Sequence, residues 1–143
     1  MPSITCQLHT QAMRAQSLSQ WVDEYLDSFA ACGRGEREAG ALVEFYGVPL
    51  LLSTDAGYSA LITQDQVVTA IQQQIDGLRA AAYDRSEVLD SKVTVINPTF
   101  AVYEGTFSRR QSDGGEIGRP TITYIITEGS LGRRISAIAI HSS

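Results

Sequence analysis

The sequence has little lysine, cysteine and histidine, and each shortage disfavours a class of function. Only Lys92 is a lysine among 11 basic residues, and acidic residues number 16. The formal charge of −5 disfavours a nucleic-acid surface, because such surfaces gather positive charge. The two cysteines (Cys6 and Cys32) and the two histidines (His9 and His141) show no metal-ligand spacing. We therefore expect no metal site and no nucleic-acid partner.

Long apolar runs are missing as well. No run approaches the roughly 18 residues needed to cross a bilayer, and residues 1–16 hold no apolar stretch typical of a signal peptide. We expect no membrane segment and a cytoplasmic location. Neither a GxGxxG pattern nor a phosphate-binding loop is present, and we expect no cofactor.

The C-terminal third is rich in β-forming residues. Four runs follow one another there, and only short turn-forming clusters separate them. The runs are residues 88–96, 100–110, 117–127 and 133–141. This spacing predicts an antiparallel meander that upstream helices must cover.

Three upstream segments have the spacing of helices. Residues 17–31 carry an apolar stripe behind a capping box that begins at Ser17, and residues 36–45 form a shorter segment that Gly47 and Pro49 end. The third helix begins at a second capping box, Thr63 to Gln66, and runs to residue 82. A predicted hairpin, residues 50–52 and 58–62, lies between the second and third helices. Residues 1–16 lack periodicity and are expected to be a flexible arm, followed by one domain over residues 17–143.

Short motifs sit at fixed places in this order. Phe45-Tyr46-Gly47-Val48-Pro49 joins the second helix to the first strand, and Gly132-Arg133-Arg134-Ile135 opens the last strand. In these motifs and in its α-α-β-β-α-β-β-β-β order the chain resembles the nuclear transport factor 2-like superfamily, which includes SnoaL-like and ketosteroid isomerase-like proteins. Arg133 stands where that family commonly has tryptophan. The chain resembles in particular a group of small actinobacterial proteins of unknown function.

The resemblance implies an α+β fold in which a curved, mostly antiparallel sheet forms a cone wrapped by three helices. Alternate strand residues then point into a pocket. A polar residue on that face is costly unless it is paired or used, so inward polar residues are candidates for function.

Glu104 and His141 are the residues that we expect to carry chemistry. By alternation Glu104 shares a strand face with Phe100 and Val102. If that face lines the pocket, Glu104 could transfer protons as a general acid or base. If the Tyr103 face is inside instead, Glu104 is exposed. His141 closes the last strand and is either a pocket base near neutral pH or a half-exposed terminal residue.

Aromatic residues are the candidates for contacting a ligand. They are Trp21, Tyr25, Tyr46 and Tyr124. Each has an alternative as a core residue whose polar atom finds a neighbouring acceptor. The resemblance to ketosteroid isomerase-like proteins implies a tyrosine donor in the pocket and a general-base aspartate near the second helix. The nearest acids in this sequence, Glu44 and Asp55, stand elsewhere.

The arginines near strand ends also have two interpretations. They are Arg109, Arg110, Arg119, Arg133 and Arg134. A solvated rim on an acidic protein is favoured over a small anion site.

Two functions of different classes follow. The first is binding of a small, largely apolar molecule in the cone, with cofactor-independent lyase, isomerase or hydrolase chemistry. The second is a non-catalytic ligand-binding or dimerisation module, because exposed strand faces carrying isoleucines favour a second copy of the chain. We expect a homodimer in either case.

Overall fold

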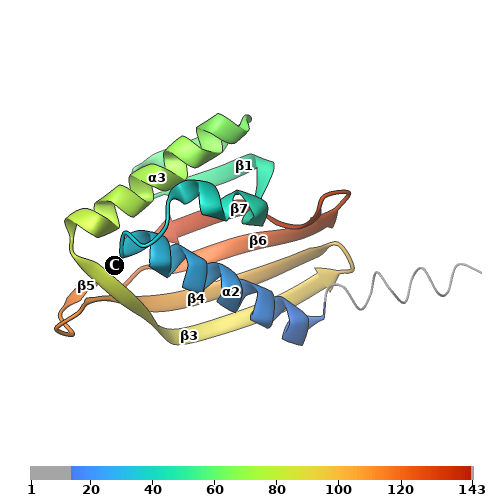
Figure 1. The fold of residues 1–143 in the computed structure, drawn as a ribbon. Coiled ribbons are helices and arrows are strands. Elements are labelled where there is room, and N and C mark those ends of the chain that lie inside the picture. Colours follow the sequence, from blue (N-terminus) through green and yellow to red (C-terminus); the bar gives the residue numbers. More distant parts are fainter. Residues whose placement is uncertain (1–13, 143) are drawn as a thin grey trace, which may run out of the picture.

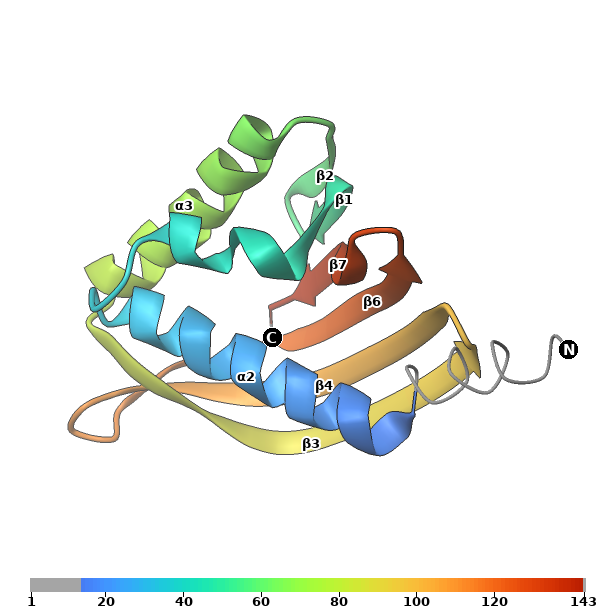
Figure 2. The same ribbon diagram turned by 45° about the vertical axis from the view of Figure 1, so that its right-hand side comes forward.

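The computed structural model describes residues 14–142, in which helices cover the inner face of one curved sheet (Figures 1 and 2). Residues 1–13, most of the expected flexible arm, lie outside the described residues. The helical elements are α2 (Ala15–Gly33), the 3₁₀-helix η1 (Ala39–Phe45) and α3 (Gln64–Ala80). The strands are β1 (Tyr46–Thr54), β2 (Gly57–Leu61), β3 (Tyr83–Asn97), β4 (Phe100–Gln111), β5 (Glu116–Gly118), β6 (Thr121–Gly129) and β7 (Gly132–His141).

The seven strands form one sheet in the order β2-β1-β7-β6-β4-β3, with β5 paired to β4. All neighbours are antiparallel except β1 and β7, which run parallel. The expected α+β cone with a mostly antiparallel curved sheet is confirmed. None of the helices in residues 14–142 is long and apolar enough to span a membrane.

The start of α2 differs from the prediction. The helix begins at Ala15, because the backbone N–H of Leu18 already donates to the carbonyl oxygen of Arg14 at 2.9 Å. The Ser17 hydroxyl donates to the same carbonyl at 3.3 Å from inside the first turn, and no side-chain hydrogen bond caps this end of α2, so the capping box predicted there is wrong. The cap predicted for α3 is confirmed, since the Thr63 side chain accepts from the Gln66 N–H at 3.2 Å.

The second helical segment is shorter and tighter than predicted. It is a seven-residue 3₁₀-helix that passes directly into β1 at Tyr46. Gly47 and Pro49, which were expected to end a helix, therefore lie within a strand.

The predicted strand 117–127 is two strands in the structure. Pro120, which has no N–H to donate to a neighbouring strand, separates β5 from β6. Its carbonyl oxygen still accepts from the Phe107 N–H at 3.0 Å, so the break stays attached to β4.

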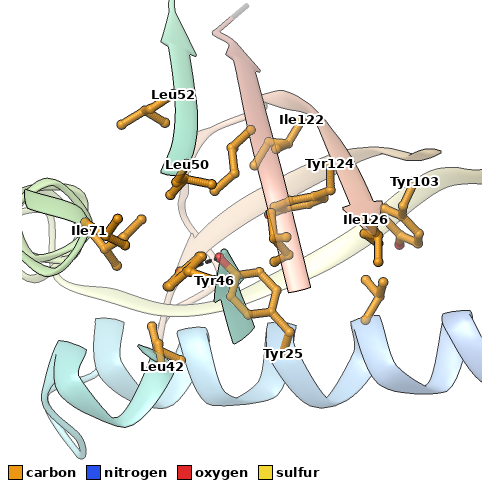
Figure 3. Close-up of a cluster of buried hydrophobic side chains, with 14 of the residues drawn as sticks. Tyr25, Leu42, Tyr46, Leu50, Leu52, Ile71, Tyr103, Ile122, Tyr124 and Ile126 are labelled. Atoms are coloured by element: carbon orange, nitrogen blue, oxygen red, sulfur yellow. Dashed lines mark hydrogen bonds between the residues drawn. The ribbon is translucent and has the colours of Figure 1, made fainter. Parts of the chain in front are cut away.

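Both long helices pack on the inner face of the sheet, and the core lies between the helices and the sheet (Figures 2 and 3). Leu18 and Val22 of α2 and Ile71 and Ile75 of α3 are buried there. On β4 the buried set includes Ala101, Tyr103 and Phe107, whereas Glu104 is exposed. The face that carries Tyr103 is therefore the inner one.

Candidate functional site

A cavity of about 390 Å³ lies between α2 and the inner face of strands β3, β4 and β6. Its volume falls within the range of roughly 300–1,000 Å³ that is typical of small-ligand pockets. Much of its wall is apolar and is made by Leu26, Phe29, Val88, Phe107 and Ile122. Helix α2 follows strands β3 and β4 along this side of the molecule, which is why one helix supplies so much of the wall (Figure 2).

Strand β4 supplies the floor of the cavity through its alternation. Phe107 and Arg109 both line it, two positions apart on the inner face. The Phe107 ring lies over Gly105, where an added Cβ would stand only 2.7 Å from the ring. A glycine at this position lets the ring lie against the strand.

One end of the cavity is polar. Arg109 of β4 stands directly opposite Ser86 of β3, and both line the cavity. The hydroxyls of Ser86 and Tyr83 are 2.8 Å apart. Burial raises the pKa of Tyr83, while its hydrogen bond with Ser86 and the charge of Arg109 lower it. The hydroxyl of Tyr83 is therefore held neutral in ordinary conditions.

The charges that line the cavity are three arginines and two aspartates, a formal sum of +1 in a chain of net charge −5. Arg34 is bound by Glu36 at 3.0 Å, and Arg85 is bound by Asp84 at 3.2 Å. Arg109 differs, because its side chain forms neither a hydrogen bond nor an ion pair with any carboxylate of residues 14–142.

Three of the four predicted ligand-contacting aromatics form one buried cluster. The Tyr25 hydroxyl of α2 lies 2.7 Å from that of Tyr46, a hydrogen bond drawn as a dashed line in Figure 3. The Tyr124 ring packs edge-on to Tyr25 at 5.6 Å. Burial raises the pKa of Tyr25 and Tyr124 far above the usual tyrosine value. Of the three, Tyr124 lines the cavity, and Tyr25 and Tyr46 support it from the core.

Trp21 lies apart from the cavity. Its ring packs edge-on against Phe45 of η1 at 5.4 Å and is partly buried against the core. This contact ties α2 to η1. The ligand-contacting roles of the aromatics stay predictions.

Glu104 and His141 lie on the outer face of the sheet, where both line one open hollow. Glu104 accepts a long hydrogen bond of 3.4 Å from Thr123, and His141 Nδ1 lies 2.8 Å from Asp55 Oδ1. The hydrogen bond from His141 lowers the pKa of Asp55. The structure thus brings these two residues to one surface but not to the cavity, and their catalytic roles stay predictions.

Tyr124 is the predicted site residue that lines the cavity, and the other lining residues were not predicted. Arg109 is one of them, since the strand-end arginines were interpreted as a solvated rim. The signal that could have found it is its two-residue spacing from Phe107 on the inner face of β4. Within residues 14–142 no group of three or more histidine, cysteine, aspartate or glutamate side chains is arranged to hold a metal ion.

Comparison with known proteins agrees with this geometry. The family described as NTF2-like protein (DUF6841) matches residues 15–143. No curated protein matches the sequence.

Among solved structures, a protein of unknown function with a cystatin-like fold from Nostoc punctiforme has a TM-score of 0.65 at 10% identity, covering 85% of this chain and 88% of its own. A candidate calcium/calmodulin-dependent protein kinase II association domain from Xanthomonas campestris gives 0.66 at 12%, covering 91% and 88%. A candidate ketosteroid isomerase from Parabacteroides distasonis gives 0.62 at 12%, covering 85% of each chain. At these identities the likeness is one of fold.

Proposed function

The chain belongs to the NTF2-like family DUF6841, and we propose that its cone cavity binds a small, largely apolar molecule. The observation that carries the proposal is the cavity itself, about 390 Å³ of space with an apolar wall and a few polar groups gathered at one end. Small-molecule sites combine these two properties, because apolar surface gives affinity and a few polar groups fix orientation. A sheet that served only as a scaffold would fill this space with side chains.

Binding is a better-supported proposal than catalysis by a lyase, isomerase or hydrolase. Such chemistry needs a proton-transferring group beside the bound molecule. The carboxylates that line the cavity are Asp23 and Asp27, and both are exposed. Tyr83 and Tyr124 have a raised pKa because of burial, so they act as neutral hydrogen-bond donors at ordinary pH. These tyrosines suit the recognition of an oxygen atom on a ligand.

The test uses a neutral fluorescent probe, N-phenyl-1-naphthylamine, whose emission rises when it enters an apolar site. We expect saturable binding with one site per chain. Ala30→Trp, which places a large ring from α2 at the cavity wall, should abolish it. Ala80→Trp, at an exposed alanine of α3, is the matched control and should leave binding intact. Absence of saturable binding, or equal binding by both variants, would contradict the proposal.

A second proposal, self-association, rests on a different observation. An apolar row crosses the outer face of the sheet through cross-strand neighbours. It consists of Val102, Ile125, Ala137, Leu51 and Ala60. Apolar side chains in line suit the packing of two like sheets, so we propose a homodimer that buries this row.

Light scattering during size-exclusion chromatography tests the dimer. We expect the wild-type mass to be twice that of the chain and Ile125→Glu to be monomeric, because a carboxylate within the row would be buried unpaired in the dimer, at a high cost. Leu131→Glu changes a 77% exposed leucine in the β6–β7 turn and should leave the dimer intact. A monomeric wild-type protein would overturn this proposal without affecting the first.

A further inference from the structure

We propose that the molecule bound in the cavity is a small amphipathic anion whose carboxylate is held by Arg109. This inference rests on the proposed binding function and adds the chemical class of the ligand. It follows from the placement of one arginine, the pairing of the other two and the division of the cavity into a polar and an apolar end.

The first argument is the unpaired charge of Arg109. Arginines that serve only stability are commonly bound by a carboxylate, as Arg34 is by Glu36 and Arg85 is by Asp84 in the same wall. Arg109 lies on the inner face of β4, is partly buried, and has no such partner among residues 14–142. Its guanidinium nitrogens are not buried without a partner, so they are open to the cavity, where a bound carboxylate would form charge-assisted hydrogen bonds with them.

The second argument is the set of groups around this guanidinium. Ser86 faces Arg109 across the β3–β4 pair, and its hydroxyl is 2.8 Å from that of Tyr83. Burial raises the pKa of Tyr83 and Tyr124, and the positive charge of Arg109 offsets part of the rise in both. Hydroxyl donors beside a guanidinium are the groups that bind a carboxylate, which has two acceptor oxygens and no donor.

The third argument is the order of residues along the strands. Two residues along from the pair Ser86–Arg109, the paired residues are Val88 and Phe107, and both line the cavity. Further along the same wall comes Ile122. A ligand with its carboxylate at Arg109 would therefore lay its hydrocarbon part on these apolar side chains, which contribute about 25 cal/mol for each Å² removed from water.

Two aspartates of α2, Asp23 and Asp27, also line the cavity and oppose an anion. Both side chains are exposed, so water screens their charge more than that of partly buried Arg109. Neither forms an ion pair with Arg109.

Competition against the neutral probe N-phenyl-1-naphthylamine tests the inference. Decanoate and 1-decanol share one hydrocarbon chain and differ at the head group. With the wild-type protein we expect decanoate to displace the probe at a concentration about tenfold lower than 1-decanol, since a charge-assisted pair is worth about that factor in affinity. Equal potency of the two competitors would overturn the inference.

Arg109→Gln removes the charge and should weaken decanoate about tenfold while leaving 1-decanol and the probe unchanged. Arg85→Gln removes a cavity arginine that has carboxylate partners and should preserve the preference for decanoate. A preference that survives Arg109→Gln would contradict the role of Arg109. If the probe itself does not bind the wild-type protein, the proposed function fails and the inference with it, whereas probe binding without anion preference overturns the inference alone.

Discussion

The Tyr25 and Tyr46 hydroxyls show how polar atoms are accommodated in this core. They are 2.7 Å apart, and both side chains are almost fully buried. Tyr25 also packs against the rings of Phe45 and Tyr124 at 5.4 Å and 5.6 Å. The hydroxyls satisfy each other across two elements, which fixes the distance between α2 and the start of β1.

Removing one hydroxyl leaves the other buried without this partner. We expect Tyr25→Phe and Tyr46→Phe each to lower the free energy of unfolding by about 1–3 kcal/mol. The double variant should lose less than the sum of the two, because the second substitution removes a hydroxyl that has already lost this partner. Urea unfolding of the four proteins measures this coupling, and strictly additive losses would show that the two hydroxyls do not stabilise each other.

At the scale of elements, the two predicted capping boxes provide a direct comparison. Thr63 caps α3 by accepting from the Gln66 N–H, whereas Ser17 lies inside α2 and donates to a carbonyl. Thr63→Ala should therefore lower the free energy of unfolding by about 1 kcal/mol. Ser17→Ala should change it by no more than about 0.5 kcal/mol. Thermal unfolding of the two variants checks the difference, and similar losses would mean that Ser17 stabilises the start of α2 by another route.

These caps also show where sequence reasoning reaches its limit. The periodicity of α2 and α3 and the turn clusters of the meander predicted the type and order of the elements, because they depend on neighbours in the chain. The exact ends of elements were predicted less well. Helix α2 begins earlier than predicted because the Leu18 N–H donates to the carbonyl of Arg14, and Pro120, which has no N–H, splits one predicted strand into two.

The candidate site was harder to predict than the fold for the same reason. Alternation along β4 separated a face with Tyr103 and Phe107 from a face with Glu104, but it could not say which one the helices cover. That choice depends on α2, which packs on one face of the sheet and is distant from β4 in the chain. Choosing the other face moves Glu104 outside and brings Arg109 into the cavity.

For the molecule as a whole, buried tyrosines set a limit on stability at alkaline pH. Burial raises the pKa of Tyr25, Tyr46 and Tyr124, whereas in the unfolded chain tyrosine ionises near pH 10. The contribution of each is fully present below about pH 10. It is lost as the pH rises further, since only the unfolded state ionises there, by up to about 1.4 kcal/mol per pH unit for each tyrosine.

We expect the free energy of unfolding in urea to be nearly level from about pH 8 to about pH 10 and to fall steeply above that. Tyr46→Phe should make the alkaline fall less steep by one tyrosine's share. Tyr58→Phe, at a side chain that is 66% exposed, should leave the slope unchanged. A fall that begins well below pH 9 would point to other groups.

The central place of β7 has a consequence for how the protein is made. The hairpin of β1 and β2 joins the rest of the sheet only through β7, which comes last of the seven strands in the chain. A ribosome therefore releases the hairpin long before its partner exists. Until β7 is made, β1 has no neighbour on that edge, and its buried residues Leu50 and Leu52 have no completed core to pack into. During synthesis the edge of β1 that pairs with β7 is unpaired, so the hairpin can reach its final place in the sheet only after β7 has been made.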